Sequence, residues 1–497
     1  MVEANMFVWI LAALAVSVSA QWDPHFAPGH STIVHLFEWK WNDIALECER
    51  FLGPRGFGGI QVSPPNENVI VQQPGNRPWY ERYQPQSYKL ITRSGDEAAF
   101  ADMVRRCNNV GVRIYPDIII NHMAAHPGLA EGTGTGGSVA NPGLRDFPAV
   151  PYGPSDFNPS CSINDWNNIY EVRNCELVGL PDLNQAVPWV RDRIVDFLNH
   201  LIDLGVAGFR VDAAKHMWPG DMEIIFNRLN NLNTAHGFAP NSRAFMAQEV
   251  IDRSGTEPIR SFHYTHLGTV TEFRFSDYMA RQFGGHDALA WLRNFGEGWN
   301  MLPSRDALVF VDNHDNQRDH ALSYKVPRPY KMATAFAAAY PYGQLRIMSS
   351  FAFERGDQGP PADANGNLIP PSINADNTCG NGWICEHRWR QITNMIKFRN
   401  LCWGTSLQNW WDNGQNKIAF GRGNCGFIAF NNQNADFLEV LQTGLPPGIY
   451  CDIISGDVVN HACTGKTVTV LADGRASIHI PQSGEDGVVA FHIQSRL

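Results

Sequence analysis

The amino-acid sequence predicts an α/β fold: a (β/α)8 TIM barrel with a loop-rich insertion domain after strand 3 and a C-terminal antiparallel β-sandwich. Three observations predict it. Eight β-branched or aromatic runs alternate with amphipathic stretches, a long segment rich in glycine and proline interrupts them, and the pattern changes near residue 403. Strands that alternate regularly with helices are typical of a parallel barrel rather than of an antiparallel sandwich.

The expected barrel strands are short apolar runs, and several of them end in polar or acidic residues. Between them lie stretches such as residues 189–205, where apolar residues recur at the 3.6-residue spacing of a helix. The eight runs cover residues 32–39, 58–65, 112–120, 207–214, 243–250, 268–275, 307–314 and 346–353.

The interruptions predict the domain boundaries. The segment after the third strand is too long for an ordinary strand-to-helix connection, and loops of that length are usually functional or form a small domain. The tail consists of short alternating runs separated by Gly, Asn and Pro, which indicates a separate all-β domain. We therefore expect a signal peptide (1–20), a catalytic barrel (21–120 and 184–403), an insertion domain (121–183) and a C-terminal domain (404–497).

Composition and the N-terminus narrow the class of protein. The chain has 497 residues, a formal net charge of −10 and no Lys/Arg cluster, which argues against nucleic acid or an anionic membrane as partner. The apolar run 6–20 is too short to span a bilayer and ends in small residues suited to signal peptidase, although the usual basic residues before it are missing. We expect a secreted, extracellular protein that begins at Gln21.

The chain contains ten cysteines, and cysteines of a secreted protein usually pair. Three candidate pairs would close short loops: Cys161–Cys175, Cys379–Cys385 and Cys451–Cys463. Spacing alone does not pair Cys48, Cys107, Cys402 and Cys425. No Cys/His spacing suggests zinc.

Three acids stand at the ends of predicted strands and are the best candidates for chemistry: Asp212, Glu249 and Asp315. An unpaired buried charge is costly, so a strand has no structural use for an acid at its carboxyl end. A parallel barrel assembles its active site there. Converging acids suggest glycoside hydrolysis, which uses a pair of carboxyls. Arg210 lies two residues before Asp212, so it shares that strand face and could keep Asp212 ionised.

Four segments resemble the α-amylases of glycoside hydrolase family 13, the animal type in particular: DIIINH (117–122), GFRVDAAKH (208–216), the strand before Glu249, and FVDNHD (310–315). The resemblance covers essentially the whole mature chain. It implies that Asp212 is the nucleophile that forms a covalent glycosyl-enzyme. Glu249 would be the general acid, and Asp315 would bind substrate hydroxyls and stabilise the oxocarbenium-like transition state.

The same resemblance implies a set of sugar-binding side chains. His122 and His314 would contact the sugar next to the scissile bond. RPWYERYQP (77–85) would form an aromatic wall on the non-reducing side, although Tyr80 stands where the family often has a second Trp. The substrate-binding set implied in this way is Trp79, Tyr80, Tyr83, Gln84, His122, Arg210, Lys215, His216 and His314.

Two ions are also implied by the resemblance. A structural Ca²⁺ would be held by Asn121, Asp182 and the backbone oxygens of Arg173 and His216, and oxygen-only ligation suits this hard cation. An activating Cl⁻ would lie between Arg210, Asn313 and Arg346. An anion near the general acid would keep it protonated near neutral pH.

Other details place the chain within the family. After His320 the sequence lacks the glycine-rich mobile loop of vertebrate members, a trait that many invertebrate members share. The resemblance also pairs Cys48 with Cys107, and Cys402 with Cys425 then follows by exhaustion.

The function that the resemblance implies is a secreted, endo-acting α-amylase that is calcium-stabilised and chloride-activated, with a digestive lumen as its setting. It would hydrolyse internal α-1,4-glucosidic bonds of starch, glycogen and malto-oligosaccharides with retention of configuration. We expect a monomer that proteinaceous amylase inhibitors could bind. The alternatives are a transglycosylase or α-glucosidase on the same scaffold, and a catalytically silent α-glucan-binding protein. The three intact acids argue against the silent protein.

Overall fold

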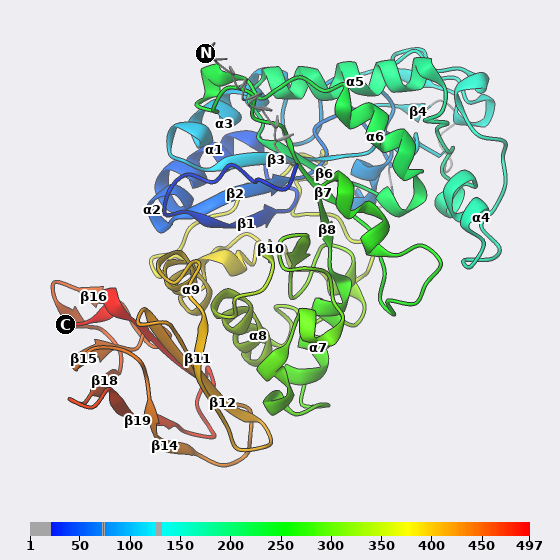
Figure 1. The fold of residues 1–497 in the computed structure, drawn as a ribbon. Coiled ribbons are helices and arrows are strands. Elements are labelled where there is room, and N and C mark those ends of the chain that lie inside the picture. Colours follow the sequence, from blue (N-terminus) through cyan, green and yellow to red (C-terminus); the bar gives the residue numbers. More distant parts are fainter. Residues whose placement is uncertain (1–20, 72, 74, 126–131) are drawn as a thin grey trace, which may run out of the picture.

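The computed structural model describes residues 21–71, 73, 75–125 and 132–497. Within them, eight parallel strands close a barrel in the order β1-β10-β9-β8-β7-β6-β3-β2, and antiparallel sheets follow it in the chain (Figure 1). The predicted fold class is confirmed. The predicted signal peptide (1–20) lies outside the described residues.

Every predicted barrel run overlaps one strand. The strands are β1 (Ser31–Leu36), β2 (Phe57–Val62), β3 (Arg113–Ile118), β6 (Gly208–Val211), β7 (Phe245–Gln248), β8 (Thr269–Thr271), β9 (Ala307–Val309) and β10 (Gln344–Ser349). Their side chains are almost all buried, as expected where helices cover a barrel on the outside and side chains fill its interior.

Every predicted run extends past the observed end of its strand, and two of these differences concern acidic residues, Glu272 and Asp315. The run 268–275 is a strand only as far as Thr271, because α7 begins at Phe273 and the Glu272 side chain caps it by accepting from the backbone N–H of Arg274. The strand β9 stops at Val309, so Asp315 stands in the loop beyond the strand and not at its last residue.

Helices surround the barrel, and their first turns follow local rules. The Asp96 side chain caps α3 by accepting from the N–H of Ala99, and proline occupies the first turn of α5, α6 and α8, where its missing N–H costs nothing. The helices are α1 (Trp41–Glu47), α2 (Gly53–Arg55), α3 (Glu97–Asn109), α5 (Pro188–Asp203), α6 (Pro219–Asn227), α7 (Phe273–Phe283), α8 (Pro327–Ala339) and α9 (Arg390–Leu401).

The insertion between β3 and α5 forms a region of its own at one side of the barrel (Figure 1). It contains the two-stranded pair β4 (Gly132–Thr133) and β5 (Val139–Ala140), the short helix α4 (Ile169–Asn174) and several 3-10 turns. Most of the remaining backbone is loop. This region therefore depends on cross-links and on contacts with the barrel for its order.

The C-terminal region is a pair of four-stranded antiparallel sheets, and α9 lies between it and the barrel (Figure 1). Buried residues such as Phe427, Tyr450, Ile478 and Phe491 form its core. One sheet contains β11 (Leu407–Asp412), β12 (Lys417–Arg422), β13 (Gly426–Asn431) and β20 (Val488–His492). The other contains β14 (Phe437–Gln442), β19 (Arg475–Ile480), β18 (Thr467–Val470) and β15 (Gly448–Cys451), and β16 (Val458–Val459) and β17 (Ala462–Cys463) form a small hairpin.

All ten cysteines are paired, in the five pairs expected from spacing and from the family resemblance. Their Cα–Cα distances run from 4.8 to 5.8 Å, a range that suits disulfides. The pairs are Cys48–Cys107, Cys161–Cys175, Cys379–Cys385, Cys402–Cys425 and Cys451–Cys463. In the part of the chain that the structure describes, no helix has both the length and the apolar character needed to cross a bilayer.

Candidate active site

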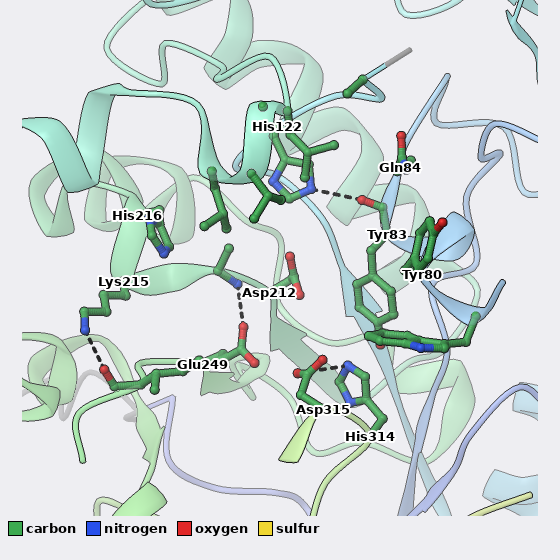
Figure 2. Close-up of a pocket in the computed structure, with 18 of the residues that line it drawn as sticks. Tyr80, Tyr83, Gln84, His122, Asp212, Lys215, His216, Glu249, His314 and Asp315 are labelled. Carbon is green, nitrogen blue, oxygen red and sulfur yellow. Dashed lines mark hydrogen bonds and ion pairs between the residues drawn. The ribbon is translucent and has the colours of Figure 1, made fainter. Parts of the chain in front are cut away.

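The three candidate acids meet at the carboxyl end of the barrel. Asp212 directly follows β6, Glu249 directly follows β7, and Asp315 opens the 3-10 turn Asn316–Arg318 beyond β9. All three line one cleft of about 870 Å³. Figure 2 shows their carboxyl groups turned toward the same space. The sequence-based expectation that they converge is thus met by the geometry.

One buried arginine joins two of these acids. The Nη1 of Arg210 donates to Oδ1 of Asp212 at 2.6 Å, and its Nη2 forms an ion pair with Glu249. The backbone N–H of Ala213 also donates to Oε2 of Glu249 at 3.0 Å. Because one guanidinium bridges both carboxyls, the nucleophile and acid candidates are held close together and in fixed orientations.

Asp117 belongs to the same cluster, although the sequence analysis assigned it no role. Its Oδ1 accepts from Nη1 of Arg210 at 2.7 Å, and its Oδ2 accepts from the Tyr83 hydroxyl at 2.9 Å. The side chain is fully buried on β3, and it is paired in register with Arg210 on β6. A carboxyl inside the strand run of DIIINH is a signal that could have revealed it, because a buried charge needs a partner.

Burial and mutual repulsion set the protonation of the cluster. Burial raises the pKa of Asp212 well above its ordinary value, and the neighbouring carboxylates Glu249 and Asp117 raise it further, while Arg210 lowers it. Burial also raises the pKa of Asp117 to about 6 and that of Asp315 to about 7. Arg210 acts in the predicted direction on Asp212, but burial outweighs it.

The aromatic wall comes from the 3-10 turn Trp79–Tyr83 in the loop after β2. The Tyr83 ring stacks on His314 with centroids 5.1 Å apart and an 8° interplanar angle, and Trp79 meets His314 edge-on at 5.6 Å. The Tyr80 hydroxyl accepts from Gln73. Tyr83 is therefore already occupied on one face, and Trp79 and Tyr80 are the more exposed rings.

Gln84, His122, Lys215, His216 and His314 also line the cleft. Arg210, which was predicted with them, is buried and is not among the lining residues, because its guanidinium contacts the acids rather than the open space. The Nε2 of His122 lies 3.0 Å from the carbonyl oxygen of Tyr83, and Nδ1 of His216 lies 2.8 Å from that of Val172. The ammonium group of Lys215 donates to the carbonyl of Ile251 and pairs with Glu257. Burial lowers the pKa of His122 and of His216 to about 4, so both imidazoles are neutral at pH 7.

One wall of the cleft was missed by the sequence analysis. It comes largely from the insertion, where Val178 has a φ of +48° and an exposed fraction of 86%, and where Trp166 meets His216 edge-on. Loop residues of this kind carry no periodic signal, and their place depends on how the insertion folds. The unpredicted lining residues are Ala125, Trp166, Leu177, Val178, Gly179, Leu180, Ala213, Ile251 and Glu257.

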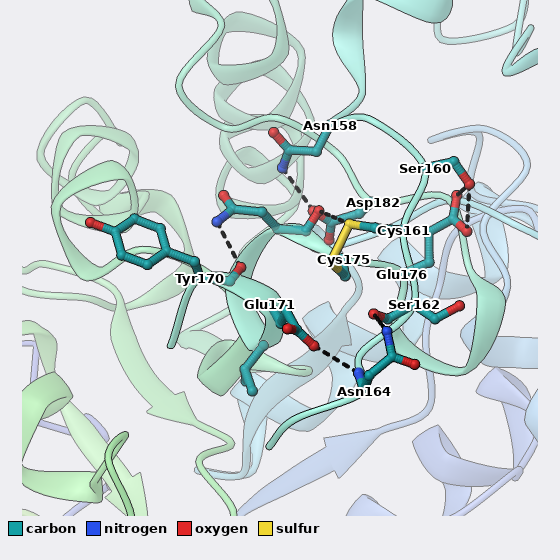
Figure 3. The surroundings of a disulfide bond; sticks show 12 residues. Asn158, Ser160, Cys161, Ser162, Asn164, Tyr170, Glu171, Cys175, Glu176 and Asp182 are labelled. Carbon is teal, nitrogen blue, oxygen red and sulfur yellow. Dashed lines mark hydrogen bonds between the residues drawn. A yellow bond between two sulfur atoms is a disulfide. The ribbon is translucent and has the colours of Figure 1, made fainter. Parts of the chain in front are cut away.

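The residues implied as calcium ligands lie where the insertion joins the barrel. Asp182 faces His122 in an antiparallel bridge, and the N–H of Leu183 donates to the carbonyl of Asn121 at 2.9 Å. Figure 3 shows Asp182 beside the Cys161–Cys175 disulfide, with Asn158 donating to it.

The donor chemistry of this junction fits a hard cation. The Oδ1 of Asn121 is buried without a hydrogen-bond partner, and Asp182 is a buried carboxylate. His216 contacts the carbonyl of Val172, next to Arg173, so the segments that hold the two implied backbone ligands adjoin. Oxygen atoms that lack donors are the ligands that Ca²⁺ prefers.

The residues implied for the anion also fit. Arg210 and Arg346 are both buried, and the Nε of Arg210 has no hydrogen-bond partner. The Nη1 of Arg346 donates to Gln61 at 2.7 Å. The Oδ1 of Asn313 accepts from the N–H groups of Asp315 and Asn316, so its amide NH₂, a donor, is the group left for an anion.

Comparisons with known proteins show the family to which the chain belongs. Residues 56–335 match the family described as "Alpha amylase, catalytic domain", and residues 408–494 match "Alpha amylase, C-terminal all-beta domain". The chain is 57% identical over 495 residues to the "Alpha-amylase" of Tribolium castaneum, with 99% of each chain covered. It is also 57% identical over 494 residues to the "Alpha-amylase-related protein" of Drosophila pseudoobscura pseudoobscura, again with 99% of each chain covered.

A solved structure is similar as well. A variant of alpha-amylase I from the earthworm Eisenia fetida, in complex with maltohexaose, superposes with a TM-score of 0.89 at 45% sequence identity. The match covers 94% of this chain and 98% of the earthworm chain. At this identity the likeness extends beyond the barrel to the whole arrangement of domains.

Proposed function

The chain belongs to the alpha-amylase family and is an enzyme of α-amylase type, and from that premise we propose that it is an endo-acting hydrolase of internal α-1,4-glucosidic bonds. Its substrates are starch, glycogen and malto-oligosaccharides. The maltohexaose bound to the earthworm relative supports this substrate class. The observation that carries the proposal is the guanidinium of Arg210, whose two terminal nitrogens contact Asp212 and Glu249.

The proposed mechanism retains the anomeric configuration. Asp212 attacks the anomeric carbon and forms a covalent glycosyl-enzyme, while Glu249 protonates the leaving oxygen and then activates water. A retaining pair stands about 5–5.5 Å apart, whereas an inverting pair leaves about 6.5–9.5 Å for a water molecule. The shared guanidinium favours the closer arrangement. Asp315, beside His314, binds hydroxyls and stabilises the positive charge of the transition state.

The neutral histidines suit hydroxyl recognition. Each neutral imidazole offers one donor and one acceptor, as a sugar hydroxyl does. Because burial lowers the pKa of His122 and of His216 to about 4, both imidazoles stay neutral well below pH 7. Trp79 and Tyr80 offer ring faces on which pyranose rings stack.

Two ions complete the proposal. Asn121, Asp182 and the carbonyls of Arg173 and His216 would hold a Ca²⁺ that clamps the insertion to the barrel, a structural role. Arg210, Asn313 and Arg346 would hold an activating Cl⁻ beside the catalytic acids. The unpartnered Oδ1 of Asn121 and Nε of Arg210 support these two assignments.

We further propose that the protein is secreted and acts as a monomer outside the cell. The apolar N-terminal run and the ten cysteines support secretion. An open cleft of this size also offers a surface that proteinaceous amylase inhibitors can block.

The test is product analysis after digestion of soluble starch and of maltoheptaose, with calcium and chloride present. Mixed oligosaccharides that appear before glucose or maltose accumulate support endo-hydrolysis. Disaccharide or transfer products would point to a glucosidase or transglycosylase instead. The variants Asp212→Asn and Glu249→Gln should each lose at least about 10³-fold in kcat if they carry the chemistry. If the unaltered protein bound glucan tightly without turnover, the alternative of a catalytically silent glucan-binding protein would be favoured.

A further inference from the structure

Arg318 lies at a junction of three loops beside the cleft, and the proposed chemistry gives it no role. It ends the 3-10 turn that begins just after Asp315. Its Nη1 donates to the carbonyl of His314, and its Nε donates to the carbonyl of Gly356 at 3.0 Å. The indole Nε1 of Trp79 donates to the same Gly356 carbonyl at 2.9 Å. One carbonyl oxygen therefore receives both the arginine and the tryptophan.

The guanidinium is also stacked between aromatic rings. Its Cζ lies 4.8 Å from the centroid of the Trp79 ring and 4.4 Å from that of Phe353. Phe37 and Phe351 are within 6 Å as well, at 5.9 and 5.7 Å. A planar guanidinium suits such a slot because it stacks flat and donates in its own plane at the same time.

The Arg318 side chain is half-buried. The Nη2 of Arg318 is buried without a hydrogen-bond partner, so the cation has lost water on that side. A cation over an aromatic face is held more strongly when it is desolvated than when it is exposed to water. Lys325 differs: it is exposed, and its Nζ lies over Phe353 alone, at 4.0 Å.

We propose that Arg318 is a positioning residue that sets the Trp79 ring as a stacking platform and so determines how tightly the enzyme holds longer glucan chains. It acts through Trp79 and the Gly356 carbonyl and does not touch the reacting atoms. The inference rests on the proposed function, because it takes Trp79 to be a sugar platform. Arg318 stands in the loop after β9, whereas the aromatic wall stands in the loop after β2. The proposal therefore gives a second loop a part in glucan specificity.

The test compares Arg318→Met with Lys325→Met in a Glu249→Gln background, which binds without turnover. Calorimetry measures the Kd for maltoheptaose. Arg318→Met keeps an apolar side chain between the rings of Trp79 and Phe353 but removes the guanidinium. We therefore expect Kd to rise about tenfold, within the range of a desolvated cation–π contact. Arg318→Lys keeps the charge without the planar fork and should raise Kd about threefold. Lys325→Met should leave Kd within about twofold, as expected for an exposed cation.

A double-mutant cycle separates positioning from general damage. If Arg318 acts through Trp79, adding Arg318→Met to Trp79→Ala should raise Kd by less than about twofold further. Full additivity would overturn the inference, and so would an unchanged Kd in the single variant. If Arg318→Met does not fold, Arg318→Lys carries the same cycle.

A readout without ligand keeps this inference separate from the proposed function. In protein labelled with 5-fluorotryptophan, the ¹⁹F resonance that disappears in Trp79→Phe belongs to Trp79. That resonance should move or broaden in Arg318→Met and stay in place in Lys325→Met. Should the Glu249→Gln protein bind no maltoheptaose, the proposed function fails while the resonance still decides whether Arg318 positions Trp79. An unmoved resonance in Arg318→Met overturns the inference.

Discussion

Replacing Asp117 by asparagine removes one negative charge from the Arg210 cluster and preserves the size of the side chain. Asp117 and Asp212 both accept from the same Nη1 atom, at 2.7 and 2.6 Å. Asp117 raises the pKa of Asp212 and of Asp315, and Arg210 lowers both. Loss of the Asp117 charge therefore lowers the pKa of Asp212 directly. It also frees Arg210 to act more strongly on Asp212, in the same direction.

Because both carboxylates accept from one nitrogen, the distance between them is limited, and this distance sets the size of the expected pKa shift of Asp212. The two accepting oxygens are at most about 5 Å apart, where two unit charges interact by about 3 kcal/mol at an effective dielectric of ~20, or roughly two pKa units. Partial protonation of Asp117, whose pKa is about 6, reduces this value near neutral pH. We therefore expect a shift of about one unit.

The assay is the pH dependence of kcat/KM for maltoheptaose, with calcium and chloride saturating. Its acid limb reports the group that must be ionised in the free enzyme, which in this account is Asp212. The limb should move to lower pH by about one unit in Asp117→Asn. A limb that stays in place or moves to higher pH would refute the reasoning. Glu386→Gln is the matched control, because Glu386 is also buried but accepts from the N–H of Ser350 and not from Arg210; its limb should not move.

Three other perturbations have defined outcomes. Arg346→Gln should keep basal starch hydrolysis and lose its stimulation by chloride in a titration with NaCl; stimulation equal to the unaltered enzyme would contradict the anion site. Calcium at 100 times its Kd should stabilise the protein by about 2.7 kcal/mol, and Asn121→Ala should abolish most of this gain in thermal denaturation. His492, near the C-terminus, has a pKa lowered by burial to about 3. Below pH 6.5 the unfolded chain binds a proton that the folded chain does not, so stability is complete above pH 6.5 and falls as pH drops toward 3. Between pH 6.5 and 4.5 the unaltered protein should therefore lose roughly 2–3 kcal/mol more than His492→Gln in urea denaturation; parallel losses would contradict this assignment.

The barrel could be predicted from the sequence because each strand is a short apolar run and each helix has a 3.6-residue period. Strand ends were less predictable. Glu272 looked like part of a strand, but its side chain caps α7, and such a cap depends on the local backbone rather than on composition. Spacing leaves the pairing of Cys48, Cys107, Cys402 and Cys425 open, so their two disulfides could be predicted only with the family resemblance.

The candidate site was predictable where chemistry and strand ends coincide, as at Asp212 and Glu249. It was not predictable where tertiary packing decides. Asp117 gained its role only when β3 lay beside β6, and Arg318 when three loops met at the Gly356 carbonyl. Val178 lines the cleft because the insertion folds over the barrel mouth, and no sequence pattern near it indicates a cleft.

The central claim is that Asp212 forms a covalent glycosyl-enzyme, so that each bond is cleaved with two inversions. Proton NMR of the first minutes of maltoheptaose digestion tests it most directly, because mutarotation of the new reducing end is slow on that timescale. The account predicts that the α-anomer appears first and that the β-anomer follows by mutarotation. First appearance of the β-anomer would mean a single inversion by water and would contradict the assignment of Asp212 as nucleophile.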